Sequence, residues 1–192
     1  MAFGYAEARH ELAEQLSRAS LGHSERVAET AAWIAGAYGA DVDAARLAGL
    51  LHDWDRDTPR VELLERAEAL GLPVTEADRA VPYLLHGPVA ARNLAARHPE
   101  LEADVVAAVA EHTVGSPLMG PLSMIVYIAD VIEPGRDHPY LSGLRESVGR
   151  VSLSQLFADA YAASLARIVD RRRPIHPVTL AVWNALVARE RR

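Results

Sequence analysis

The feature that most constrains this chain is the absence of strand-like patterning. No run combines β-branched residues with the two-residue alternation that is typical of a half-buried strand. Ala, Leu, Arg and Glu dominate instead, and these residues favour helices. The sequence therefore predicts an all-α protein. We expect helices at residues 6–18, 24–38, 42–53, 59–70, 76–82, 88–97, 102–112, 120–132, 139–150, 153–170 and 177–190.

Cap and breaker residues separate these helices. Gly39 is placed as a C-terminal cap, and Asp41 is placed as the N-cap of the helix that follows. Pro59 suits a first helical turn, and Pro134 forces a helix to end. The connections are short, and the sequence contains neither an internal repeat nor a low-complexity linker. We therefore expect one compact domain over residues 1–192.

The composition excludes several classes of protein. The net charge of −6 and the pI of 5.7 provide no basic field for nucleic acid. No window approaches about 18 uncharged apolar residues, and the N-terminal stretch is charged from residue 7, so we expect neither a membrane span nor a secretory signal. Because cysteine is absent, any metal must be held by His, Asp or Glu. This composition fits a cytoplasmic protein.

Four of the eight histidines lie at helix ends or beside apolar helical segments. With two aspartates in similar surroundings they form the ordered set His23, His52, Asp53, His86, His112 and Asp130. Burying unpaired polar groups is costly, and a metal would satisfy all six side chains. For any one histidine a hydrogen-bonded core or helix-end role is at least as common, and an adjacent His-Asp pair arises by chance about half the time. The ordered set, rather than the pair, indicates a metal site.

Two other histidines have a simpler interpretation. His10 and His98 lie in the charged stretches "EARHEL" and "AARHPE". Histidines in such surroundings are mostly solvated. We therefore expect both side chains at the surface.

Five stretches in this order carry a resemblance to a known family. They are "GHSERVAETAAWIAGAYG", "AARLAGLLHDWDRD", "LLHGPVAA", "EHTVGSPLMGPLSMIVYIADVIEPGR" and "RRPIHPVTLAVWNAL", which together run from about residue 20 to 187. The chain resembles the HD-domain superfamily of metal-dependent phosphohydrolases, and within it the YqeK-type symmetrical bis(5'-nucleosyl)-tetraphosphatases. The resemblance implies an HD-domain helical bundle around a dinuclear metal site, with a core at about 20–137 and helices of 138–192 packed on it.

The resemblance also implies which residues hold the metals. One metal would take His23, His52, Asp53 and Asp130, and the other would take His86 and His112, with Asp53 bridging the two. Ligation by nitrogen and oxygen suits iron, manganese, cobalt or zinc. The family implies iron first among these.

The activity that the resemblance implies is hydrolysis of diadenosine tetraphosphate to two ADP, by attack of a metal-bound hydroxide on an inner phosphate. The catalytic candidates are Asp53, Arg26 and Arg56, because each arginine lies three residues after a ligand, one helical turn on. The expected substrate contacts are Arg26, Arg56, Thr113, Arg136 and His176. Arg26 could instead pair with a neighbouring glutamate at the surface, and His176 could simply start a helix. Glu133 could orient a ligating histidine through its second nitrogen, or it could simply cap the helix that ends before Pro134.

Several residues are harder to interpret. Met124 stands where the family implies a lysine, and Asp55 adds a carboxylate that could weaken phosphate binding. A solvated helix end is the favoured interpretation of the run Arg171–Arg173, with a polyphosphate contact as the alternative. Trp54 and Tyr83 are the two aromatic residues to test for base stacking, although core packing is the more common role.

Two alternatives to the leading function stay open. The same metal site could serve an HD phosphohydrolase for another nucleotide, either a nucleoside monophosphate or a guanosine alarmone. It could also belong to a nucleotide-binding module without turnover. In each case the partner is a small nucleotide rather than a nucleic acid or a membrane. The oligomeric state is open, with a homodimer as one option.

Overall fold

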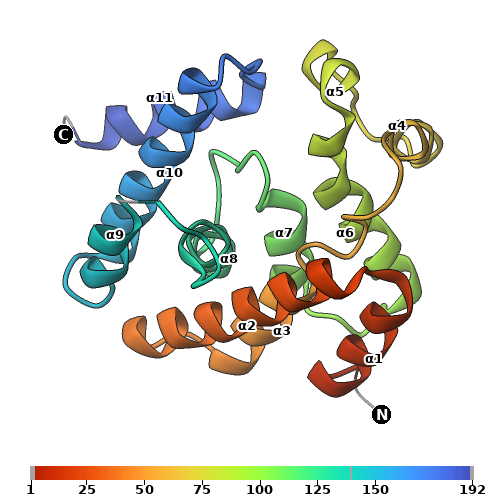
Figure 1. The fold of residues 1–192 in the computed structure, drawn as a ribbon, viewed down its shortest axis with the longest axis horizontal. Coiled ribbons are helices and arrows are strands. Elements are labelled where there is room, and N and C mark those ends of the chain that lie inside the picture. The colour runs from red at the N-terminus through yellow and green to blue at the C-terminus, as the bar shows by residue number, and fades with distance from the viewer. Residues whose placement is uncertain (1–2, 139, 191–192) are drawn as a thin grey trace.

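The computed structural model describes residues 3–138 and 140–190, and within these ranges it is all-helical, without strands (Figure 1). The elements are α1 (Tyr5–Gln15), α2 (Arg18–Tyr38), α3 (Val42–Leu51), α4 (Arg60–Ala69), α5 (Glu76–Ala80), the 3-10 helix η1 (Pro82–Leu85), α6 (His86–Arg97), α7 (Ala103–Glu111), α8 (Pro121–Ile132), α9 (Leu141–Ser147), α10 (Leu153–Asp170) and α11 (Pro177–Glu190). The all-α prediction is confirmed.

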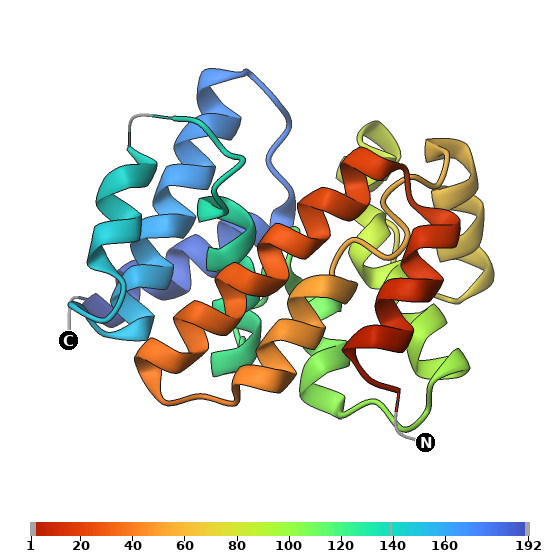
Figure 2. The ribbon, with the colours of Figure 1, turned by 60° about the horizontal axis from the view of Figure 1, so that its bottom comes forward.

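Helix α8 runs through the middle of the molecule, and the other helices surround it. Figure 1 looks nearly down its axis, with α9, α10 and α11 on one side and α4, α5 and α6 on the other. In Figure 2, α2 crosses the molecule diagonally and reaches both sides. The central helix therefore presents different faces to two groups of helices.

Two hydrophobic cores lie on these faces of α8. Ile125 and Ile128 belong to a cluster that includes Phe157 of α10, whereas Val126 belongs to a second cluster that includes Leu94 of α6. All of these side chains are at most 2% exposed. Burial on both sides fixes the rotation of α8 and hence the direction of any polar side chain on its remaining face.

The start of α2 differs from the expected helix. The expected range begins at residue 24, but α2 begins at Arg18 because Ser17 caps it and accepts a hydrogen bond from the Ser20 N–H at 3.2 Å. Asp57 reinforces this start, since it accepts from the Ser17 N–H and the Ser20 hydroxyl, both at 2.7 Å. As a result His23 lies within α2 rather than before it.

Most other helix limits agree with the expected ranges. Gly39 adopts a φ of 67° and caps α2, and Asp41 accepts from two N–H groups at the start of α3, so both cap predictions are confirmed. Pro59 is the N-cap of α4 rather than a residue of its first turn. The helix expected at 139–150 is shorter, Leu141–Ser147, and residue 139 lies outside the described residues.

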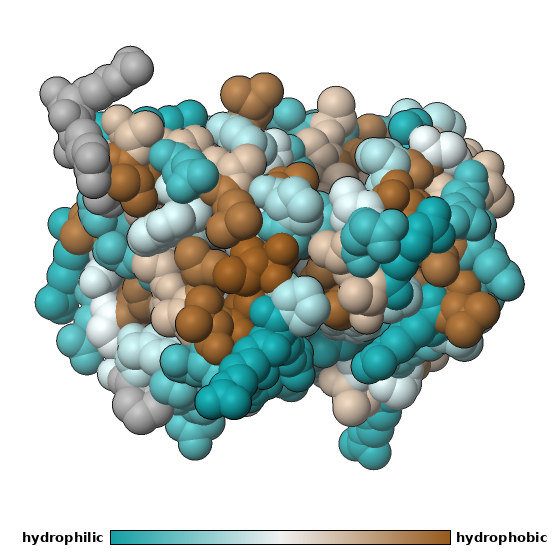
Figure 3. Space-filling model, turned by 90° about the horizontal axis from the view of Figure 1, so that it is seen from above, coloured by the Kyte–Doolittle hydropathy of each residue, from teal (hydrophilic) through white to brown (hydrophobic). Residues whose placement is uncertain are grey.

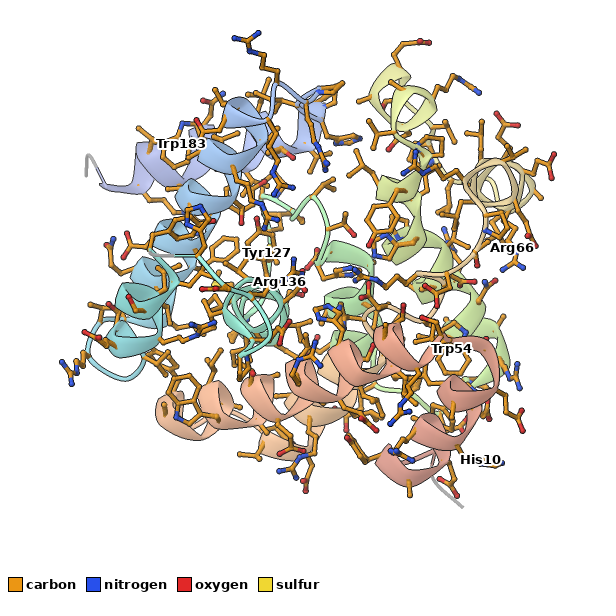
Figure 4. The ribbon with its side chains drawn as sticks, viewed as in Figure 1. His10, Trp54, Arg66, Tyr127, Arg136 and Trp183 are labelled. Carbon is orange, nitrogen blue, oxygen red and sulfur yellow. The ribbon has the colours of Figure 1, made fainter. Side chains whose placement is uncertain are left out.

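The surface prediction for His98 is wrong. Its side chain is buried, its ring stacks on Phe3 with centroids 3.6 Å apart, and its Nε2 lies 3.4 Å from Glu11 Oε2. His10 is exposed as expected, and Figure 4 places it at the edge of the molecule near α1. The charged flanks of His98 did not reveal that it ends α6 against the N-terminal segment.

The face of the molecule seen from above carries a concentration of apolar side chains. Seen from above, apolar side chains gather over the half that contains α10 and α11 (Figure 3), and Val169 and Leu180 of these helices are exposed. None of the described helices is both long enough and apolar enough to cross a membrane.

Gly49 allows α3 to pack closely on α2. A β-carbon at this position would lie 2.9 Å from the Ala28 Cα, closer than real β-carbons come, and a tight 3.1 Å from the Val27 carbonyl oxygen. We therefore expect Gly49→Ala to lower the free energy of unfolding by about 1–3 kcal/mol in chemical denaturation. Gly36→Ala, in a roomy part of α2, is the control and should raise it by about 0.5–1 kcal/mol. Equal stability of the two variants would contradict this account of the packing.

Candidate metal centre

Six potential metal ligands converge beside α8. They are His23 in α2, His52 and Asp53 at the end of α3, His86 at the start of α6, His112 at the end of α7 and Asp130 in α8. All but Asp130 are buried, and the Asp130 side chain is 23% exposed. The structure thus brings the whole predicted set together.

Asp53 lies between two pairs of histidines. Its Oδ2 is 3.4 Å from His23 Nε2 and 3.1 Å from His52 Nε2. Its Oδ1 is 3.0 Å from His86 Nε2 and 3.7 Å from His112 Nε2. Asp130 joins the first pair, with Oδ1 3.0 Å from His23 Nε2. Each oxygen of one carboxylate therefore faces a separate pair, as a bridging ligand requires.

The second nitrogen of each histidine is anchored. Three of the anchors are the carbonyl oxygen of the residue three positions earlier: Gly49 for His52 at 2.7 Å, Tyr83 for His86 at 2.6 Å and Val109 for His112 at 2.8 Å. The anchor of His23 is Glu133 Oε1 at 3.2 Å. In the tautomer in which each Nδ1 donates to its anchor, each Nε2 directs a lone pair into the cluster.

The inner nitrogens fit a metal better than they fit one another. The Nε2 atoms of His23 and His52 are buried and have no hydrogen-bond partner. The Nε2 atoms of His86 and His112 face each other at 2.9 Å. In the tautomer just described all four present lone pairs, and a cation is the partner that would satisfy them together.

The carboxylates and His112 are in the charge states that suit metal ligation, whereas the pKa of His52, which burial alone would lower, is raised by Asp53. Burial alone would raise the pKa of Asp53 and Asp130, but the adjacent histidines, and Arg136 at Asp130, hold both pKa values well below the ordinary range. Burial, and then the two nearest imidazoles, lower the pKa of His112 to about 3. Ionised carboxylates and neutral imidazoles are the forms that bind metals.

Close packing of α6 on α7 holds His112 in place. A β-carbon at Gly87 would lie 3.0 Å from His112 Cε1, and equally close to Thr113 Oγ1 and the Val109 carbonyl oxygen. The glycine next to His86 thus allows α6 and α7 to pack closely. As a result the Nε2 atoms of His86 and His112 lie within hydrogen-bonding distance.

A cavity of about 490 Å³ opens beside the cluster. Asp53 and Asp130 are the carboxylates in its lining. Its arginines are Arg56, Arg60, Arg136, Arg167, Arg171 and Arg173. The lining is therefore cationic, although the whole chain carries a net charge of −6. Such a lining favours an anionic ligand.

Three of the predicted substrate contacts lie on the cavity wall. Arg56 forms an ion pair with Asp53, and Arg136 forms one with Asp130, to whose backbone carbonyl its Nε also donates at 3.0 Å. Thr113 places Oγ1 3.2 Å from His112 Nε2. Figure 4 shows Arg136 in the centre of the molecule, beside α8.

The other two predicted contacts, Arg26 and His176, lie off this wall. Arg26 donates from Nε to Glu133 Oε2 at 2.7 Å, because its position in α2 points it at the end of α8. His176 is buried, with Nε2 3.3 Å from both Asp78 Oδ2 and Thr75 Oγ1. The structure therefore places Arg26 behind the metal cluster, and it places His176 in the contact between α5 and the start of α11.

Similarity to known proteins identifies the family of this chain. The sequence pattern of the HD domain matches residues 20–135. The chain belongs to the HD-domain family. The match includes all six clustered side chains and the end of α8.

Relatives of this HD-domain chain extend over most of its length. A protein of Bacillus subtilis is 28% identical over 175 residues, which are 91% of this chain and 93% of the relative. One of Halalkalibacterium halodurans is 30% identical over 173 residues, 88% and 89% of the two chains. Both are named symmetrical bis(5'-nucleosyl)-tetraphosphatase.

A solved structure shares the HD-domain fold described above. It is a crystal structure from Clostridium acetobutylicum, described as a predicted HD superfamily hydrolase involved in NAD metabolism. It is 30% identical to this chain, with a TM-score of 0.90 over 98% of this chain and all of the other. The helices that follow the HD match, α9 to α11, are thus part of the shared arrangement.

The end of α8 supports the cluster from behind. Glu133 is buried, and its carboxylate accepts from Arg26 and from the Gly135 N–H at 2.6 Å while it holds His23. Arg145 of α9 donates to the carbonyl oxygens of Ile132, Glu133 and Arg136, at 2.7, 2.9 and 2.9 Å. Sequence reasoning missed Arg145, because it lies nine to thirteen residues from its partners and no spacing rule connects them.

Other residues of the cavity wall were missed or interpreted differently. Arg167 and Arg60 were not singled out, although Arg167 lies four residues before Arg171, one turn apart on the same face of α10. Arg171 and Arg173 are exposed, as a solvated helix end implies, but they also line the cavity. Helical spacing from Arg171 was the signal that could have found Arg167.

Asp55 lies outside the cavity lining, so its position does not support the expectation that it weakens phosphate binding. Asp55 is buried outside the cavity lining, and it accepts from Arg66 and Asn93, both at 2.8 Å. It connects the loop after α3 to α4 and α6. Met124 packs against the core cluster around α10.

The two aromatic candidates for base stacking, Trp54 and Tyr83, lie in different parts of the molecule. Trp54 is buried against His98, away from the cavity, and Figure 4 shows it beside α1. Tyr83 lines the cavity, with its ring centroid 4.4 Å from that of His86 and 6.0 Å from the Arg56 Cζ. Of the two, Tyr83 is the one that a ligand can reach.

Glu133→Gln keeps the size of this side chain and removes its charge. We expect metal affinity to fall at least about tenfold, because the carboxylate that orients the His23 ring is lost. Calorimetric titration with Mn²⁺ measures the change, and Glu65→Gln on the exposed face of α4 is the control. Wild-type affinity in Glu133→Gln would contradict the orienting role.

Proposed function

We propose that this HD-domain protein is a metal-dependent hydrolase that cleaves diadenosine tetraphosphate symmetrically into two ADP. The observation that carries the proposal is the juxtaposition of the histidine–aspartate cluster with a cavity lined by arginines. A chain of four phosphates is a strongly anionic ligand that such a lining suits. The names of the relatives support the same substrate.

The cluster divides into two sets of ligands. One metal would be held by His23, His52 and Asp130 and the other by His86 and His112, with Asp53 shared between them. Nitrogen and oxygen ligands suit iron, which we propose first, as well as manganese, cobalt and zinc. The chemistry that such a pair supplies when bound is acidification of water and neutralisation of phosphate charge.

The chain's own residues bind and orient the phosphates. Arg56 and Arg136 stand at the cavity wall beside the carboxylates of the cluster, where their planar guanidinium groups can each hold two phosphate oxygens. The Thr113 hydroxyl, next to His112, can donate to a third. Together they would place an inner phosphorus against the cluster in a fixed orientation, which is most of what phosphoryl transfer requires of a protein.

A nucleotide panel with metal analysis tests this function. Protein prepared anaerobically is assayed for bound metals and then given diadenosine tetraphosphate, nucleoside monophosphates and a guanosine alarmone. ADP as the sole product from the tetraphosphate supports the proposal, whereas AMP plus ATP would show asymmetric cleavage. Release of inorganic phosphate from a mononucleotide, with no action on the tetraphosphate, would overturn it in favour of another HD phosphohydrolase. Tight nucleotide binding without turnover would indicate a binding module.

A further inference from the structure

Three arginines at the end of α10 differ from the two cavity arginines that pair with the cluster, Arg56 and Arg136. Arg167, Arg171 and Arg173 all line the cavity. Arg56 and Arg136 are paired with the ligand carboxylates, whereas among the described residues no carboxylate forms an ion pair with the three arginines of α10 and its following turn. The α10 wall therefore carries positive charge that the protein itself leaves uncompensated.

The electrostatics of Arg167 reflect this crowding. Partial burial of this otherwise exposed side chain, and then the charges of Arg171, Arg136 and Arg173, lower the pKa of its guanidinium. Like charges that face one space repel one another, and an anion placed between them would turn that repulsion into attraction.

The backbone after α10 directs two of the three side chains. Arg172 adopts a φ of 51°, the left-handed region that residues other than glycine seldom occupy. Its neighbours Arg171 and Arg173 both line the cavity, and Arg172 does not. Favourable interaction with the helix dipole explains cations at the end of α10, but it does not require them to face the cavity.

We propose that Arg167, Arg171 and Arg173 form a second phosphate subsite, which binds the half of the substrate that lies away from the metal ligands. The inference rests on the proposed function and deepens it. A mononucleotide held at the metal cluster leaves this wall unused, whereas a polyphosphate joined to two nucleosides reaches both. The subsite therefore selects dinucleoside polyphosphates over mononucleotides and simple phosphate esters. Ser164, three residues before Arg167 in α10, adds a hydroxyl to the same wall.

Binding of inorganic tripolyphosphate tests the subsite without reference to catalysis. Metal-loaded protein is titrated calorimetrically with tripolyphosphate and with orthophosphate, in wild type and in the combined variant Arg167→Ala, Arg171→Ala and Arg173→Ala. All three side chains are exposed, so the variant should fold normally. We expect tripolyphosphate to bind at least about tenfold more weakly, with a smaller loss for orthophosphate. Tripolyphosphate affinity within about twofold of wild type would overturn the proposal.

Arg172→Gly is the matched control. It removes one positive charge from the same turn, its side chain does not line the cavity, and glycine accepts the left-handed backbone. Tripolyphosphate affinity should therefore stay close to that of wild type. A loss as large as that of the combined variant would show that only general charge matters, and it would overturn the subsite.

Kinetics separate this inference from the function on which it rests. If wild type cleaves diadenosine tetraphosphate, the combined variant should lower kcat/KM for that substrate about tenfold more than for p-nitrophenyl phosphate. Equal losses would overturn the subsite and leave the proposed function standing. If wild type does not cleave the tetraphosphate, the proposed function fails, and tripolyphosphate binding alone decides the subsite.

Discussion

Asp53→Asn is expected to lose both bound metals and hydrolytic activity, with kcat/KM at least about a thousandfold below wild type. Asp53 is the side chain whose two oxygens face both pairs of histidines, and it is 1% exposed. Asparagine keeps its shape but supplies one neutral oxygen and an NH₂ group that repels cations. The remaining ligands would then lack the shared negative charge that holds two cations close together.

Asp55→Asn is a matched control for this prediction. It makes the same chemical change two residues away, in another buried aspartate, but Asp55 faces Arg66 and Asn93 instead of the cluster. We expect Asp55→Asn to lose about 1–3 kcal/mol of stability and to keep its metals. Metal content from elemental analysis, set beside thermal melts of both variants, separates the two roles. Full metal loading of Asp53→Asn would show that the ligand assignment is wrong.

The helical fold could be predicted because its signals are local. The caps at Gly39 and Asp41 and the helix formers between them act within a few residues, so most helix limits agree with the structure. The start of α2 was missed because its cap, Ser17, is reinforced by Asp57, which is forty positions away in the chain. A tertiary contact of this kind leaves no periodic signal in the sequence.

The histidines of the cluster could be predicted from the sequence because three of them share one local arrangement. His52, His86 and His112 each end a helical turn and bond to the carbonyl three residues before. That arrangement turns a helix end into a ligand, and the apolar flanks bury it. Family resemblance supplied the rest, namely how the six side chains divide between two metals.

Side-chain direction across separate helices could not be predicted. Arg26 and Arg56 each follow a predicted ligand by three residues, and the sequence gives no reason to treat them differently. The packing of α2 against the end of α8 turns Arg26 to Glu133, while the turn after α3 leaves Arg56 at the cavity. His176 was likewise placed by the contact of α11 with α5, which no local pattern reveals.

Because Arg26 and Arg56 face different partners, we expect their alanine variants to lose activity for different reasons. Arg56→Ala should lower kcat/KM about a hundredfold even with metal in excess, because the guanidinium beside Asp53 at the cavity wall would otherwise hold phosphate oxygens. Arg26→Ala should act through Glu133 and His23, and therefore on metal affinity. Since the Arg26 side chain is 44% exposed, solvent weakens its pairing, and we expect a loss of only several-fold.

Titration with metal distinguishes these two modes of failure. Activity of Arg26→Ala, measured against increasing Mn²⁺ at fixed diadenosine tetraphosphate, should return to the wild-type level, because its substrate wall is intact. Activity of Arg56→Ala should reach a plateau far below that level, and excess substrate should raise it further, because the lost contact lies between protein and phosphate. If metal restored Arg56→Ala, or if Arg26→Ala stayed deficient at saturating metal, the two side chains would share one role, as their identical spacing from a ligand implies.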